Sequence, residues 1–122
     1  MRFSQDLSSN VNVIRGYGPG ELRINDAVFS TSMIVASEAI HAAPALVDAA
    51  GLAPEHAAQL IALQPEVVLI GTGRRQVFPA AAFGAQFLQA GIGFEVMDTG
   101  AACRTFNVLV SEQRRVAALL IL

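Results

Sequence analysis

Pro65-Glu66-Val67-Val68-Leu69-Ile70-Gly71-Thr72-Gly73 is the stretch that decides the fold. Its apolar run, Val67–Ile70, is too short for a helix and is typical of a strand that is covered on both faces. The run ends at Gly71-Thr72-Gly73, and a residue between two glycines indicates a tight backbone turn. We therefore expect a buried strand that passes directly into a turn.

Two later segments predict further strands of the same sheet, Gly93–Met97 and Val116–Leu122. A helix that opens at Pro79 precedes the first of them, and a helix capped by Asp98 or Thr99 precedes the second. Strands that alternate with helices lie parallel and are joined by right-handed crossovers. Because Val116–Leu122 contains no polar residue, we expect it at the centre of the sheet.

The helices that cover the sheet are marked by proline and by apolar spacing. Pro54 suits the first position of a helix that precedes the buried strand. In the helix after Pro79, we expect Phe83, Phe87 and Leu88 to form the buried face.

The first 37 residues have no helical period and read as a β meander. Its expected strands are Val11–Tyr17, Glu21–Ile24, Ala27–Thr31 and Met33–Ser37, with a turn at Gly18-Pro19-Gly20. The alanine-rich segment that follows predicts only a helical turn over Ala45–Ala50. Residues 1–10 are polar, and we expect them to fray. The predicted fold is a single α/β domain over residues 1–122, with three layers, a mixed central sheet, an N-terminal antiparallel meander and three helix-linked strands.

Composition excludes several classes of protein. Hydrophobic residues make up 53% of the 122 residues and charged residues 15%, so a disordered chain is excluded. No apolar run approaches the length of a membrane span, and the first residues lack the apolar core of a signal peptide, so we expect a cytoplasmic protein. The net charge of −2 and the absence of a basic cluster argue against a nucleic-acid binder. A single cysteine excludes an internal disulfide.

The carboxyl ends of the predicted parallel strands are the place where a ligand would bind. Backbone amides of the glycine turn could hold an anion there. Arg74 or Arg75 beside the turn, and Arg104 of the following helix, could add positive charge. The candidate ligand-binding residues are Gly71, Thr72, Gly73, Asp98, Thr99 and Arg104. The pattern fits neither a dinucleotide fingerprint, since position 76 is Gln, nor a phosphate loop, since the chain has no Lys; we expect no cofactor.

Each candidate also has a purely structural interpretation. The glycine turn can simply connect a strand to the next helix, and Asp98 or Thr99 can serve only as a helix cap. Cys103 lies near a helix start beside Arg104, where a lowered pKa would make its thiol reactive, but it also lies at the edge of the helix's apolar face and can be a small core residue. The two histidines, His41 and His56, have no spacing that indicates a metal site.

Three motifs resemble those of a small domain-of-unknown-function family: Gly16-Tyr17-Gly18-Pro19-Gly20, Gly71-Thr72-Gly73 and the longer stretch Met97–Asn107. Its eukaryotic relatives include a mitochondrial complex I assembly factor and an adipogenesis-associated protein. The resemblance covers about Val11 to Leu122. It implies a three-layer α/β fold with a central mixed sheet and an extra β layer, and it implies no established enzymatic activity.

Two functions from different classes follow from these observations. The first is an accessory or protein-interaction domain without catalytic activity, as the resemblance implies, with a protein partner of unknown identity and a monomeric or weakly oligomeric state. It involves no nucleic acid and no membrane insertion. The alternative is a small-molecule or anion-binding protein, an enzyme included, whose site lies at the carboxyl ends of the parallel strands.

Overall fold

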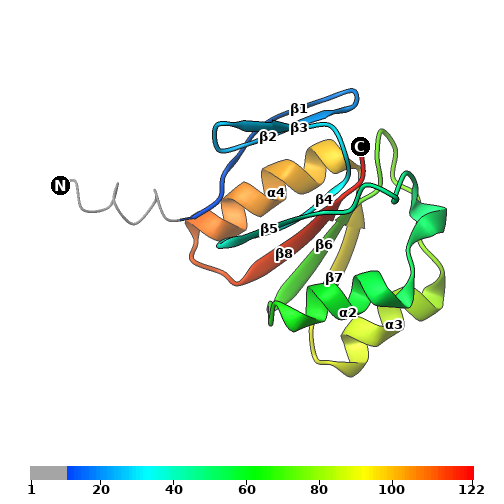
Figure 1. Ribbon diagram of the computed structural model, residues 1–122. Helices are drawn as coiled ribbons and strands as arrows, with labels where there is room; N and C mark the ends of the chain where they lie inside the picture. Colours follow the sequence, from blue (N-terminus) through cyan, green and yellow to red (C-terminus); the bar gives the residue numbers. More distant parts are fainter. Residues whose placement is uncertain (1–10) are drawn as a thin grey trace.

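The computed structural model describes residues 11–122, and these form two β-sheets and four helical segments (Figure 1). The N-terminal sheet is an antiparallel meander of β1 (Ile14–Gly18), β2 (Glu21–Ile24) and β3 (Ala27–Phe29). The larger sheet has five strands in the order β5-β4-β8-β6-β7. The predicted fraying of residues 1–10 lies outside the described residues.

The parallel part of the larger sheet confirms the prediction. β6 (Val67–Gly71) pairs in parallel with β7 (Gly93–Met97) on one side and with β8 (Val116–Leu120) on the other. Every residue of β6 and β8 is buried, and β8 is the middle strand of the five. A strand without polar side chains is stable in this place because helices cover both of its faces.

The expectation that Met33–Ser37 belongs to the meander is wrong. β4 (Met33–Ala36) pairs antiparallel with β8 in the larger sheet, and it also forms a hairpin with β5 (Ala39–Ala42), a strand that the alanine-rich composition did not predict. Because β4 pairs with β8 inside the larger sheet, its side chains are buried on both faces. A strand in the meander would have one face open to solvent. A short apolar run identifies a strand but carries no information about the sheet to which it belongs.

Helices cover both faces of the larger sheet (Figure 1). α2 (Pro54–Ala62) and α3 (Ala81–Gln89) pack on one face, where Phe87 and Leu60 share a core with Val68. α4 (Thr99–Ser111) packs on the other face, and the meander covers the outer side of α4. The fold is therefore the predicted three-layer α/β arrangement around a mixed sheet, with the meander as an additional β layer.

Two helical predictions are corrected in detail. A short 3-10 helix, η1, occupies Ala49–Gly51 and overlaps only the end of Ala45–Ala50, where a helical turn was expected. In α3, Leu88 is 75% exposed, whereas Phe83 and Phe87 are 4% and 0% exposed, so Leu88 is not part of the buried face. A helix turns by about 100° per residue. Around the helix axis, Phe87 therefore lies about 40° from Phe83, whereas Leu88 lies about 140° from Phe83.

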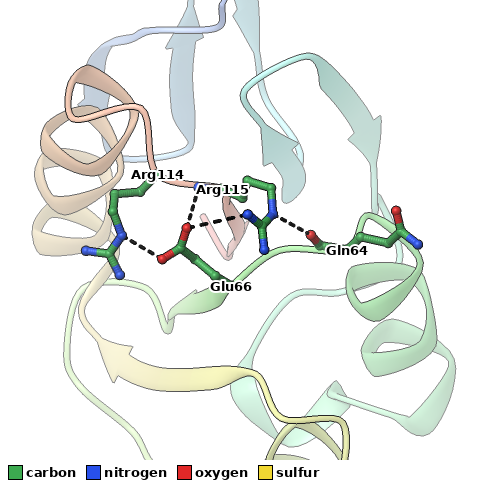
Figure 2. Close-up of polar contacts among 4 residues, drawn as sticks. All are labelled: Gln64, Glu66, Arg114 and Arg115. Carbon is green, nitrogen blue, oxygen red and sulfur yellow. Dashed lines mark hydrogen bonds and ion pairs between the residues drawn. The ribbon is translucent and has the colours of Figure 1, made fainter.

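A polar cluster ties the start of β6 to the loop between α4 and β8, as Figure 2 shows. The Glu66 carboxylate accepts a hydrogen bond from Nε of Arg114 at 2.8 Å and one from the backbone N–H of Arg115 at 3.2 Å. Nε of Arg115 donates to the backbone carbonyl of Gln64 at 3.3 Å. The hydrogen bond from Arg114 and, to a smaller extent, that from the backbone of Arg115 lower the pKa of Glu66 below its ordinary value. The cluster lies at the amino ends of the parallel strands, opposite to the predicted site.

Candidate functional site

Thr99 joins three elements at the carboxyl ends of the parallel strands. Its hydroxyl accepts a hydrogen bond from the backbone N–H of Gly73 at 2.7 Å and donates one to the carbonyl of Ile121 at 2.6 Å. Its own N–H donates to the carbonyl of Gly73 at 2.8 Å. The side chain is fully buried. Thr99 thus links the turn after β6, the start of α4 and the end of β8.

The glycine turn is held by internal hydrogen bonds. The N–H of Thr72 donates to the carbonyl of Met97 at 2.9 Å, and its hydroxyl donates to the carbonyl of Arg75 at 2.6 Å. The same hydroxyl accepts from the N–H of Val77 at 3.0 Å. The amides of Thr72 and Gly73 are therefore already occupied, which favours the interpretation of this stretch as a connection rather than an anion cradle.

Gly71 is required by close packing of α4 on β6. A Cβ atom at this position would lie 2.9 Å from Cα of Thr99 and 3.1 Å from Cβ of Ala102. Real Cβ contacts of 2.9 Å do not occur, so only glycine fits here without moving the helix. Asp98 caps the same helix, since its Oδ1 accepts from the N–H of Ala101 at 2.8 Å. The predicted cap is thus formed, and the predicted residues Gly71, Thr72, Gly73, Asp98 and Thr99 do meet at one edge of the sheet.

Arg104 lies apart from these internal contacts and is exposed. A Cβ atom placed on Gly100 would lie 3.6 Å from Nη1 of Arg104 and 3.7 Å from Cδ2 of the Tyr17 ring, so both side chains approach the same point beside Gly100. Oδ1 of Asp98 lies 3.4 Å from that point. We call this group, in which Arg104 is exposed and Tyr17 half-buried, the Tyr17–Arg104 surface. Tyr17 was not among the predicted ligand residues, because only tertiary packing brings β1 to the start of α4.

The Tyr17 phenol lies among charged groups. Burial raises the pKa of Tyr17 above its ordinary value, and nearby Cys103 and Asp98 raise it further, whereas Arg74 and the side chain of Thr99 lower it. The phenol therefore stays protonated at neutral pH and is available as a hydrogen-bond donor. With Arg104 beside it, this surface could bind an anion.

Two of the surface hollows in residues 11–122 contain aromatic side chains that were not among the predicted site residues. One, of about 270 Å³, is formed by the β1–β2 hairpin and includes Tyr17, Pro19 and Arg23. The other, of about 370 Å³, lies between α3 and the edge strand β7. We call the second one the α3–β7 groove. Its apolar lining includes Phe78, Pro79, Gly84, Leu88, Phe94 and Val96.

The α3–β7 groove combines an aromatic floor, packed on the core, with exposed apolar side chains at its rim. Phe94 stacks on Phe87 with ring centroids 5.0 Å apart and meets Phe83 edge to face at 6.0 Å. Phe78 and Leu88 stand at the rim and are 74% and 75% exposed. Such exposure of large apolar side chains beside one hollow is typical of a surface that another molecule covers.

Comparison with known proteins agrees with this fold. Residues 14–121 match the model of a family described as protein of unknown function, DUF498/DUF598. The chain belongs to the DUF498/DUF598 family. The family resemblance predicted from the sequence is thereby confirmed.

Three relatives of this DUF498/DUF598 chain illustrate the similarity. It is 29% identical to a 13 kDa major membrane protein of Francisella tularensis over 86% of each chain. It is 45% identical to the NADH dehydrogenase 1 alpha subcomplex assembly factor 3 of Danio rerio, over 51% of this chain and 36% of that protein. The crystal structure of an outer membrane protein from Bartonella henselae matches it with a TM-score of 0.82 and 33% identity, covering 92% and 95% of the two chains.

Two of these names mention membranes, and the structure of this DUF498/DUF598 chain shows whether its helices could span one. No helix in the described part of the chain is long and apolar enough to cross a bilayer. Within residues 11–122, no group of three His, Cys, Asp or Glu side chains is placed to hold a metal ion.

Cys103 of this DUF498/DUF598 chain lies in the core and is 5% exposed. Burial raises the pKa of its thiol to about 12, and the opposing effect of Arg104 is smaller. A reactive cysteine needs a lowered pKa and access to solvent. Both observations favour the core interpretation over that of a reactive thiol.

The sequence interpretation missed the α3–β7 groove for specific reasons. Leu88 was assigned to the buried face of its helix, and Phe78 was not assigned any role. The available signal was an aromatic residue followed by Pro79 in a segment without helical or strand period. That Gly84 leaves room for the ring of Phe94 follows only from the packing of α3 on β7, because a Cβ at Gly84 would lie 2.8 Å from Cε2 of that ring.

Proposed function

We propose that this DUF498/DUF598 chain is an accessory domain that binds another protein through the α3–β7 groove and does not itself catalyse a reaction. The observation that carries the proposal is the pair of exposed apolar side chains, Phe78 and Leu88, at the rim of a 370 Å³ apolar hollow. A relative named as an assembly factor supports the same role, since such proteins act by binding other proteins.

The energetics of the groove suit a protein partner. Burying a leucine or phenylalanine side chain that was exposed contributes about 1.5–3 kcal/mol. Two such side chains at one rim can therefore form the centre of an interface, where a few residues commonly supply most of the binding energy. The surrounding alanines of α3 add apolar area without charges that would have to be desolvated.

The experiment is a capture assay with matched variants. The tagged chain is used to capture its partner from an extract of the source cells, and affinity for that partner is then measured with purified proteins. Leu88→Ser should weaken binding by about tenfold or more. Val47→Ser is the matched control, because Val47 is 72% exposed but does not line the groove. Equal loss with both variants, or no loss with Leu88→Ser, would contradict the proposal.

The second candidate function is anion binding at the Tyr17–Arg104 surface. It is favoured by the approach of the Arg104 guanidinium and the Tyr17 ring to one point beside Gly100, in the first turn of α4. Titration calorimetry with inorganic phosphate tests it. Arg104→Ala should abolish binding while folding stays intact, since surface substitutions usually change stability by within about 0.5 kcal/mol. Arg115→Ala, at the opposite end of the sheet, should leave binding unchanged.

A cytoplasmic location and a monomeric or weakly oligomeric state belong to the same proposal. The names of two relatives refer to membranes, so the location needs a direct test. Cell fractionation should recover the protein in the soluble fraction. Recovery in the membrane pellet after a high-salt wash would contradict the proposed location, and would do so independently of the groove.

A further inference from the structure

The outer edge of β7 is open along its middle residues. The N–H of Gly93 donates to the carbonyl of Glu66, and the carbonyl of Met97 accepts from the N–H of Thr72, so both ends of β7 direct backbone groups toward β6. Backbone groups in a parallel pair alternate in direction from one residue to the next. The N–H and C=O groups of Phe94 and Val96 therefore point away from the sheet.

Only one of these four groups has a partner among residues 11–122. The side chain of Gln76 donates from Nε2 to the carbonyl of Val96 at 2.9 Å. That contact is exposed and comes from a side chain, so an incoming strand has one hydrogen bond to displace. Open strand edges of this kind are sites where another extended chain can pair.

The side chains of β7 divide between its two faces. Those of Phe94 and Val96 belong to the α2–α3 side and line the α3–β7 groove. Glu95 points to the opposite face, is exposed, and has no ion-pair partner within residues 11–122. An added strand would thus place alternate side chains in the apolar groove and the one between them beside a carboxylate.

We propose that β7 accepts an extended segment of a partner protein as an added strand, with an apolar–basic–apolar sequence at its centre. The two apolar side chains enter the α3–β7 groove, and the basic side chain lies opposite Glu95. The inference rests on the proposed protein-binding function and specifies how the partner is held. Main-chain hydrogen bonds supply affinity in this mode, and the groove and Glu95 supply specificity.

A second copy of this chain is a poorer occupant. The antiparallel register that uses Phe94 and Val96 of both copies places the two Glu95 carboxylates directly opposite each other. Like charges in directly opposed positions destabilise a strand pair. Sedimentation should therefore show no dimer formed through β7, and added peptide should displace none.

The test uses the folded chain and a display library of peptides of about six residues, the usual length of a strand. Selected peptides should share the apolar–basic–apolar pattern. On binding, the amide protons of Phe94 and Val96 should become protected from hydrogen exchange. Peptides that fill the groove through side chains alone would leave these two amides unprotected, and that result would overturn strand addition.

Val96→Pro is the sharpest variant, because it removes an N–H that points outward and no hydrogen bond to β6 is lost. It should weaken the selected peptide by about tenfold or more, whereas Val96→Thr, which keeps the N–H, should stay within about threefold. Should Val96→Pro not fold, the exchange measurement on the natural chain still decides. Unchanged peptide affinity in folded Val96→Pro would also overturn the inference.

Charge reversal tests the occupant's chemistry. Glu95→Arg should bind a peptide with Glu at the central position better than one with Arg, by about two- to fivefold, reversing the preference of the natural chain. Lack of reversal would overturn the basic position. The two proposals can fail separately. If a captured partner is sensitive to Leu88→Ser but the Phe94 and Val96 amides stay unprotected, the proposed function stands and the strand-addition inference fails.

Discussion

Thr99 is the residue on which the carboxyl edge of the sheet depends most. Thr99→Val would leave the N–H of Gly73 and the carbonyl of Ile121 buried without their side-chain partner. Each unsatisfied buried group costs about 1–3 kcal/mol, so we expect unfolding free energy to fall by about 2–5 kcal/mol in urea titrations. Thr99→Ser keeps the hydroxyl and should lose far less; equal losses for the two variants would contradict the role of the hydroxyl.

Cys103 should react slowly in the folded protein. Its pKa of about 12, against a reference of 9.0, makes the thiolate about a thousandfold rarer at neutral pH than in an unfolded chain. Iodoacetamide should therefore alkylate Cys103 far more slowly in the native state than in urea. Alkylation of the folded chain as fast as that of the unfolded chain would restore the reactive-thiol interpretation.

The same thiol makes stability depend on alkaline pH. Because the folded pKa is raised, the protonated thiol stabilises the fold fully below pH 9.0, and this contribution is lost as pH rises toward about 12. Urea midpoints should decline over that range more steeply for the natural chain than for Cys103→Ala. Parallel curves for the two proteins would contradict the assignment, since Tyr17 titrates in both of them.

At the scale of elements, α3 packs closely on β7 because Gly84 leaves room for the ring of Phe94. Gly84→Ala favours helix by about 1 kcal/mol in isolation, but the new Cβ would lie 2.8 Å from the Phe94 ring, which is itself stacked on Phe87. Overpacking costs about 1–3 kcal/mol, so we expect a net loss of up to about 2 kcal/mol in unfolding free energy. Phe94→Leu should relieve it. A stabilised Gly84→Ala variant would show that α3 shifts freely over β7.

Sequence patterns predicted the elements best where both faces of a strand are covered. β6 and β8 follow directly from apolar runs between helices, and Asp98 is one of the two residues predicted to cap α4. The place of β4 was not predictable, because its partner β8 lies more than 80 residues away along the chain. β5 was missed because alanine carries little strand preference.

The position of the candidate site could be predicted, but whether its backbone amides are free to bind a ligand could not. The sequence places Gly73 and Thr99 at one edge because parallel strands share a direction, and the structure joins them by a hydrogen bond. Which backbone amides remain free is decided by tertiary contacts. The exposed groups that do remain free, at the Tyr17–Arg104 surface and in the α3–β7 groove, come from segments that no local pattern connects.

For the whole molecule, the meander is a separate layer that α4 holds to the larger sheet, together with hydrogen bonds from Asn12 to the β4–β5 hairpin. Asn107 of α4 accepts a hydrogen bond from the N–H of Ile14 at 2.9 Å and donates to the carbonyl of the same residue at 2.8 Å. Loss of the two bonds in Asn107→Ala should cost about 1–3 kcal/mol. Hydrogen exchange should then quicken in the meander amides by about tenfold or more, with a smaller change in β8.

Ser111→Ala is the control for that measurement, because the Ser111 hydroxyl bonds only to the carbonyl of Val108 within its own helix. It should leave the exchange of meander amides unchanged. Equal acceleration of meander and β8 amides in Asn107→Ala would show that the two sheets open together rather than as separate layers.

The central position of β8 has a consequence for biosynthesis. A ribosome delivers the N-terminal part of a chain first, and β8 follows all the other strands in residues 11–122. Until it emerges, the β4–β5 hairpin and the β6–β7 pair have no strand between them, and each presents an open, apolar edge. The larger sheet therefore cannot be completed before its last strand has been translated, and the chain that still lacks β8 is the form most in need of a chaperone.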